Sequence, residues 1–249
     1  MRLLLLFLFL PLLLTAQRVD ENGDEYGGYL FGVKGGLTIG QQQWNNFQRE
    51  ALFSYHGIAF IETLPEEGRF ALFAQLGYHI KGSRIVQRNV LNPISGNIFR
   101  APAESFEFNN LSLSIGGKQT IAFTPVANIY YLLGVRLDYT VSTNLDEYNN
   151  VNSQFRLFYP IEDNQFLRRI NYGVIAGGGF EFPLNEKIAG ILEFTINPDF
   201  SLQYMQPRID NVIDPFTSGT TSIPERNIRN LTFEVTAGFK FLRKIIYLD

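Results

Sequence analysis

The sequence predicts an all-β fold: an eight-stranded antiparallel up-and-down transmembrane β-barrel with short periplasmic turns and long extracellular loops. Three observations predict it. The segment 231–241, LTFEVTAGFKF, alternates apolar and polar residues without a break. Seven earlier segments alternate in the same way. The connections between them are long and short in turn, as expected of an even-stranded barrel whose long loops lie outside the cell.

The first 16 residues are expected to be a cleaved signal peptide. Arg2 precedes an apolar run from Leu3 to Leu14, and Ala16 ends the segment with a small residue suited to cleavage. The run is shorter than the roughly 20 apolar residues that a spanning helix needs. An exported chain is therefore predicted rather than one held by an N-terminal helical anchor.

Three further regions follow from composition: a polar periplasmic lead-in at 17–28, a β-barrel domain at 29–242 and a C-terminal tail at 243–249. The chain has no cysteine, which excludes disulfides and thiol chemistry. The formal net charge of −3 gives no electrostatic case for a nucleic-acid partner. Abundant Phe and Tyr favour strands.

The alternation places strands at 29–40, 52–64, 69–83, 106–123, 129–142, 171–182, 188–197 and 231–241. The long connections are 41–51, 84–105, 144–168 and 205–228, and the short ones are 65–68, 124–127 and 183–187. The start of the fourth strand, FEFNN, is out of phase with the residues after it, which predicts a β-bulge near Asn109. To close the barrel, the last strand must pair with the first.

A four-residue turn joins the second and third strands and suggests their register. If Leu64 faces Arg69, then Ser54 faces His79 and His56 is a diagonal neighbour. Both histidines of the chain would then lie on the inner face of the barrel, near its outer mouth.

The polar faces carry charges of both signs in equal number, which favours a lumen of buried ion pairs over a solvated surface. The expected network consists of Lys34, Lys81, Lys118, Arg136, Lys240, Glu62, Asp138, Glu181, Glu193 and Glu234. Eight strands enclose a space that side chains just fill, so a diffusion pore is not expected. Aromatic residues near strand ends are expected to face lipid as girdles, namely Tyr29, Tyr78, Tyr130, Tyr139, Tyr172, Phe182 and Phe241.

The chain resembles the PorT-like family of small outer-membrane β-barrel proteins. The resemblance covers nearly all of the mature chain and depends on YLFGVKGGLTIGQQQW at 29–44, GYHIKGS at 77–83 and LTFEVTAGFKF at 231–241. It implies an outer-membrane location and, for some members, a part in protein secretion. The chain differs from the family at its C-terminal end. Such barrels commonly finish on an aromatic residue, whereas here LRKIIYLD follows Phe241.

Ser54, His56 and His79 are the residues that suggest catalytic or metal chemistry, because a serine beside two histidines suits a hydrolase and two imidazoles suit a metal ion. The competing interpretation, that they pack the lumen as polar side chains, is preferred. Neither a catalytic site, a metal site nor a cofactor is expected.

The leading hypothesis is a non-enzymatic outer-membrane barrel with a structural or interaction role, accessory to a secretion or envelope assembly. Its expected partners are outer-membrane lipids and envelope proteins met through loops 84–105, 144–168 and 205–228. One alternative is a lipid-active or protease-like barrel enzyme using Ser54, His56 and His79. Another is a soluble lipocalin-like ligand binder, whose apolar face would point inward.

Overall fold

The computed structural model describes residues 17–19, 25–45, 48–64, 70–86, 89–91, 96–100, 105–124, 126–147, 164–213 and 219–246. Fourteen strands and one short 3-10 helix lie in these ranges. Among the described residues, no helix is long and apolar enough to cross a membrane. The expected signal peptide at 1–16 lies outside the described residues.

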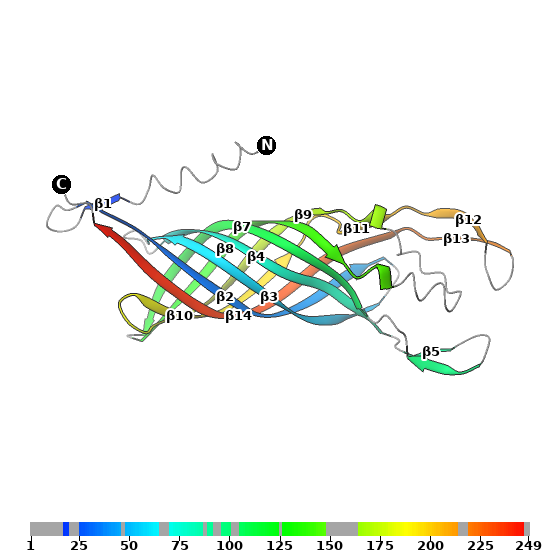
Figure 1. Ribbon diagram of the computed structural model, residues 1–249, viewed down its shortest axis with the longest axis horizontal. Coiled ribbons are helices and arrows are strands. Elements are labelled where there is room, and N and C mark those ends of the chain that lie inside the picture. Colours follow the sequence, from blue (N-terminus) through cyan, green and yellow to red (C-terminus); the bar gives the residue numbers. More distant parts are fainter. Residues whose placement is uncertain are drawn as a thin grey trace.

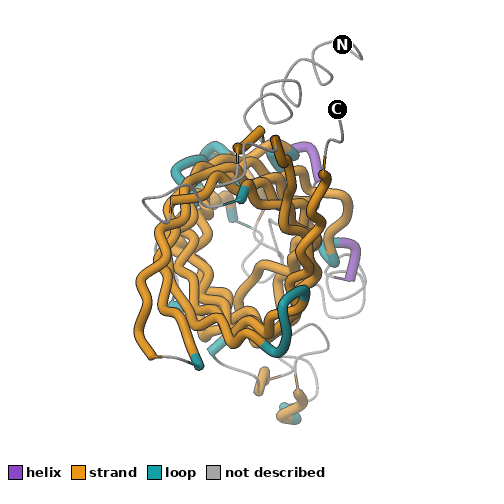
Figure 2. The backbone as a smooth tube through the Cα atoms, turned by 90° about the vertical axis from the view of Figure 1, so that its left-hand side faces the viewer, coloured by secondary structure: helices purple, strands orange, loops and turns teal. Residues whose placement is uncertain are grey.

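Eight long strands form the wall of the barrel. They are β2 (Glu25–Trp44), β3 (Arg49–Thr63), β4 (Phe70–Ile85), β7 (Ser105–Thr124), β8 (Ala127–Thr143), β9 (Ile170–Pro183), β10 (Ile188–Pro198) and β14 (Arg226–Ile246). Each pairs antiparallel with the next in chain order. β14 also pairs with β2, so the sheet closes into the ring seen end-on in Figure 2. The predicted fold class and the predicted pairing of the last strand with the first are confirmed.

Most strands extend beyond their predicted ends. β2 and β14 stay paired from Trp44 and Ile228 to Tyr26 and Ile246, so part of the expected lead-in and part of the expected tail belong to strands. Residues 41–44, three glutamines and Trp44, belong to β2 and shorten the first connection, which was predicted to span 41–51. The predicted bulge near Asn109 is confirmed, because the register between β7 and β8 shifts between Asn109 and Asn110.

The predicted long loops contain short elements of their own. Within 84–105, β5 (Asn89–Leu91) pairs with β6 (Ile98–Arg100). Within 205–228, β12 (Ile209–Ile213) pairs with β13 (Thr220–Ile223). The remaining elements are β1 (Gln17–Val19), which pairs with β2, β11 (Tyr204–Gln206), which pairs with β14, and the 3-10 helix η1 (Asn164–Phe166).

Figure 1 gives the barrel two distinct ends. β1 and the last residues of β14 lie at one end, called here the terminal end, on the left of the picture. The β5 and β12–β13 segments project past the barrel at the other end, called here the loop end. This agrees with the expected arrangement of short turns at one end and long connections at the other.

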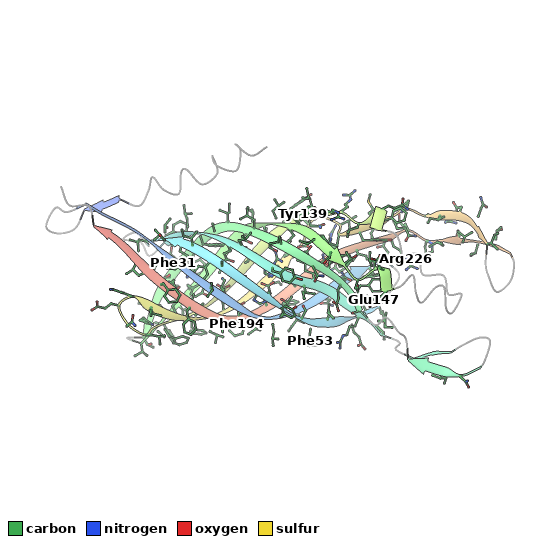
Figure 3. All side chains as sticks on the ribbon, viewed as in Figure 1. Phe31, Phe53, Tyr139, Glu147, Phe194 and Arg226 are labelled. Carbon is green, nitrogen blue, oxygen red and sulfur yellow. The ribbon has the colours of Figure 1, made fainter. Side chains whose placement is uncertain are left out.

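The outer wall of the barrel is apolar and exposed. Figure 3 shows side chains radiating from the ribbon all along its length, with Phe53 and Phe194 among those labelled. Phe53 is 63% exposed and Leu133, in the middle of β8, is 64% exposed. On the same strands the alternate residues are buried, and over the described residues the buried side chains are more often polar or charged than apolar. The predicted direction of the two faces is therefore confirmed, and the inward apolar face that a lipocalin-like binder needs is absent from the described strands.

Candidate functional site

The lumen of the barrel gathers nearly all the buried charge. All ten residues of the expected network are buried, and each takes part in at least one ion pair. Asp199, which directly follows β10, is an eleventh member and is 2% exposed. The lumen therefore contains six carboxylates against five basic groups among the described residues, rather than the equal numbers that the sequence predicts.

A four-residue ion cluster occupies the lumen near the terminal end. Lys118 Nζ lies 2.9 Å from Glu62 Oε1 and also contacts Glu181 Oε1. Lys240 Nζ lies 2.6 Å from Glu181 Oε2 and 3.6 Å from Glu62 Oε2. The four side chains line a cavity of about 280 Å³ together with Thr120, Asn128 and small apolar groups. Two lysines and two glutamates thus neutralise one another where the barrel opens.

An apolar layer lies next along the lumen. It consists of Ile58, Phe60, Phe73, Tyr130, Leu132, Ile175 and Ile191, contributed by β3, β4, β8, β9 and β10. Because these side chains come from facing walls, they meet across the lumen and block it. The sequence did not predict this layer, because its residues lie on the same strand faces as the charged residues of the expected network.

Tyr130 was predicted to face lipid in a girdle, and this prediction is wrong. Its side chain is 1% exposed within the apolar layer, and its hydroxyl donates a hydrogen bond to Glu193 Oε2 at 2.8 Å. Glu193 also accepts from Lys34 Nζ at 2.6 Å. Gly179 makes room for the ring, because a Cβ there would lie 2.8 Å from the Tyr130 hydroxyl. The even-numbered phase of β8, shared with Arg136, would have placed Tyr130 inside.

A central ion cluster lies on the loop side of the apolar layer and consists of Lys81, Arg136, Asp138, Asp199 and Glu234. Lys81 Nζ lies 2.8 Å from both Asp138 Oδ2 and Asp199 Oδ1. Arg136 Nε donates to Asp138 Oδ1 at 3.0 Å, and Arg136 Nη1 lies 3.7 Å from Glu234 Oε1. Lys81 and Asp138 are completely buried. Three carboxylates against two bases give this cluster the negative excess of the whole lumen.

The predicted register of β3 and β4 is wrong by two residues. His56 pairs directly with His79, rather than Ser54 with His79, and the register shifts between Ala51 and His56. A two-residue shift preserves the facing of side chains, so both histidines still point inward, each 4% exposed. Their rings stack with centroids 5.4 Å apart. The predicted turn at 65–68, and Arg69 on which the predicted register was based, lie outside the described residues.

The hydrogen bonds of the two histidines lead to threonines and to Glu234 rather than to Ser54. His79 Nδ1 lies 2.7 Å from Glu234 Oε1. His56 Nδ1 lies 2.9 Å from Thr38 Oγ1, and His56 Nε2 lies 2.9 Å from Thr236 Oγ1.

The Ser54 hydroxyl donates to the carbonyl oxygen of Ile80 at 2.6 Å. A serine–histidine pair of the kind that activates a nucleophile is therefore not formed by Ser54 in this arrangement.

Toward the loop end, the lumen is filled first by amides and then by a second apolar cluster. Asn230 donates from Nδ2 to Asp199 and to Gln203, and its Oδ1 accepts a hydrogen bond from Gln42 Nε2. The second cluster, called here the apolar cap, contains Phe106, Phe108, Leu145, Tyr204 and Ile228. Five successive layers therefore occupy the lumen between the two ends.

The closed ring, the apolar exterior and the ion-paired lumen together define the fold of the eight-stranded outer-membrane β-barrels. No family model matches the sequence, and no curated protein matches it either.

Several solved structures share the arrangement. Neisserial surface protein A (NspA) is 8% identical, with a TM-score of 0.47, over 87% of this chain and 97% of that one. Ail, the attachment invasion locus protein of Yersinia pestis, is 9% identical, with a TM-score of 0.39, over 86% and 99%. The outer membrane protease OmpT from Escherichia coli is 9% identical, with a TM-score of 0.39, over 92% and 98%. By their names these three are a surface protein, an attachment protein and a protease.

Proposed function

We propose that the chain is a bacterial outer-membrane barrel, exported by a cleaved signal peptide, that acts as a non-enzymatic structural or interaction protein. We further propose that it is a PorT-like accessory part of a secretion or envelope assembly. The terminal end then faces the periplasm and the loop end faces outward. The observation that carries the proposal is the contrast between a lumen filled by side chains and a loop end extended by the β5–β6 and β12–β13 hairpins.

The filled lumen argues against conduction and against catalysis in the interior. The apolar layer and the apolar cap lie on either side of the histidines, so a substrate has no wide path to them among the described residues. The hairpins, in contrast, present exposed apolar side chains, with Ile98 73% and Ile213 71% exposed. Exposed apolar groups on projecting segments favour contact with another protein.

A charge on the outer wall tests whether that wall faces lipid. We expect Leu133→Arg to destabilise the folded barrel by about 2–4 kcal/mol in bilayers, because Leu133 lies midway along β8 and an arginine at the midplane must be desolvated. The measurement is reversible urea unfolding in lipid vesicles, followed by fluorescence of Trp44, the single tryptophan.

The matched control is Val126→Arg, since Val126 is 72% exposed but precedes the start of β8. We expect an effect of about 0–1 kcal/mol there. Equal and negligible effects at both positions would contradict a lipid-facing wall, and so would recovery of the processed chain in the soluble periplasm.

Photo-crosslinking tests the interaction role. A photoreactive residue at Ile98 or Ile213 is expected to yield covalent adducts with other envelope proteins in intact cells, because both side chains project from hairpins at the loop end. The same probe at Leu133 is expected to yield no protein adduct, because lipid surrounds that position. Adducts are identified by mass spectrometry after purification in detergent. Protein adducts absent at both hairpins would count against the proposal.

A further inference from the structure

We infer that His56, His79 and Glu234 form a site for a divalent transition metal, with zinc as the best-suited ion, inside the barrel. One ligand atom from each of the three residues lies within 4.8 Å of the other two. Imidazole nitrogens and a carboxylate oxygen are the ligands that zinc takes at sites with three protein ligands. The inference is independent of the proposed function, since it concerns the lumen rather than the loops.

The strands bring these residues together from well-separated parts of the sequence. His56 on β3 pairs with His79 on β4, and Glu234 on β14 pairs with Thr38 on β2. β2 lies between β3 and β14, so His56 must reach across it. Gly36 is the residue of β2 that pairs with both His56 and Thr236, and it has no side chain to obstruct the imidazole. A Cβ at Gly36 would overlap the backbone of Val235, so glycine is required there.

The surrounding hydroxyls complete the ligand environment. Thr38 Oγ1 lies 2.9 Å from His56 Nδ1 and Thr236 Oγ1 lies 2.9 Å from His56 Nε2, so both ring nitrogens have a hydroxyl partner. Metal binding requires one of these threonines to release its nitrogen, while the other keeps orienting the ring, as the second nitrogen of metal-bound histidines commonly allows. Thr195 donates to the second oxygen of Glu234 at 3.3 Å. The three ligand atoms, which lie within 4.8 Å of one another, must draw closer together for one ion to lie at the roughly 2 Å distance of zinc–nitrogen and zinc–oxygen bonds.

The charge of the central ion cluster, to which Glu234 belongs, favours the binding of a cation. The central ion cluster contains one more carboxylate than base when both histidines are neutral, and neutral histidine is the form that binds metal. A buried uncompensated negative charge is costly, which favours uptake of a cation. The positive charge of Arg136 partly offsets this negative charge. Arg136 does not hydrogen-bond to Glu234, because its Nη1 lies 3.7 Å from Glu234 Oε1, beyond hydrogen-bonding distance. No other group of three metal-ligating side chains is found in the described residues.

Because the site is enclosed, we expect zinc to enter and leave it slowly. Because the apolar layer and the apolar cap lie on either side of it, zinc added before the barrel closes is expected to be retained against a chelator. Zinc added to the folded barrel is expected to enter slowly. An adventitious surface ion would behave in the opposite way, binding at once and being removed at once.

The experiment refolds the full mature chain in detergent micelles with ZnCl₂, removes loose metal with EDTA and counts zinc by mass spectrometry. We expect one zinc per barrel in the wild type. In His56→Gln, His79→Gln and Glu234→Gln we expect the affinity for zinc to fall at least about tenfold, the smallest loss that is typical when a residue supporting a metal site is replaced. Ser54→Ala is the matched control on the same face of β3 and is expected to keep the metal, because Ser54 hydrogen-bonds to backbone.

Cobalt provides a readout that needs no variant. A cobalt-loaded wild-type barrel is expected to show the intense visible absorption of low-coordinate cobalt with nitrogen and oxygen ligands, which supports the site even where a variant does not fold. A folded wild type that retains neither stoichiometric zinc nor this spectrum would overturn the inference. Equal retention by folded wild type and His79→Gln would also overturn it.

Discussion

Val235→Pro is expected to abolish assembly of the barrel. Val235 lies in the middle of β14 and pairs with Phe194 on one side and Leu37 on the other. Proline lacks the N–H that the ladder needs and is found in sheets only at edges and bulges. In lipid, each backbone group left unpaired costs several kcal/mol, since no water replaces the lost partner. We expect no folded chain in outer-membrane fractions, measured by protease resistance and electrophoresis without heating.

Val235→Ala is the control for this experiment. It also loses the apolar side chain, which is 37% exposed, but it keeps the N–H. We expect Val235→Ala to insert and to resist protease as the wild type does. Normal insertion of Val235→Pro would refute the conclusion that the β2–β14 pairing closes the wall.

Lys81→Met is expected to destabilise the folded barrel by about 3–5 kcal/mol, because it leaves buried carboxylates without their counter-charge. Lys81 is completely buried and its ammonium contacts Asp138 and Asp199. Asp138 keeps its bond from Arg136, whereas Asp199 keeps only neutral donors such as Asn230. Urea unfolding in vesicles, followed by Trp44 fluorescence, measures the loss.

A second substitution separates charge from packing. Adding Asp199→Asn to Lys81→Met removes the stranded carboxylate, so we expect the double variant to recover most of the lost stability. The control is Arg208→Met, which breaks the Arg208–Asp210 pair between side chains 64% and 61% exposed. An exposed pair contributes about 0–1 kcal/mol. Equal losses for Lys81→Met and Arg208→Met would show that the lumen pairs carry no special stability.

The period-two pattern was sufficient to predict the wall, because burial in a barrel depends only on which side of the strand a residue occupies. The need to close the barrel predicted the pairing of 231–241 with the first strand, and the balanced charges of the polar faces predicted the direction of the apolar face. The period-two pattern could not predict the hairpins at 89–100 and 209–223, because the residues that bound their short strands do not alternate. It also misplaced the ends of strands, since polar residues such as Gln42 lie in paired strand at the loop end.

The lumen was harder to predict than the wall, because ion pairs form across the barrel between strands that the sequence separates widely. The pairing of a given lysine with a given glutamate depends on the tilt of the strands and on the shear of the barrel, and a short stretch of sequence specifies neither of them. Asp199 was missed because the predicted strand ended at residue 197, yet the inward phase of Glu193, Thr195 and Asn197 continues to it. Glu234 was expected in the charge network, but nothing local placed it beside His79.

The pairing of β2 with β14 also bears on the order in which the strand pairs of the barrel form during folding. These two strands lie at opposite ends of the described chain, and their ladder runs from Trp44 to Tyr26 without interruption. Such long-range pairing forms late, because the entropy of bringing distant segments together is lost before the contacts compensate for it. Until β14 pairs with β2, a partly formed sheet has two open edges. A folding factor that shields those edges would protect the chain from aggregation.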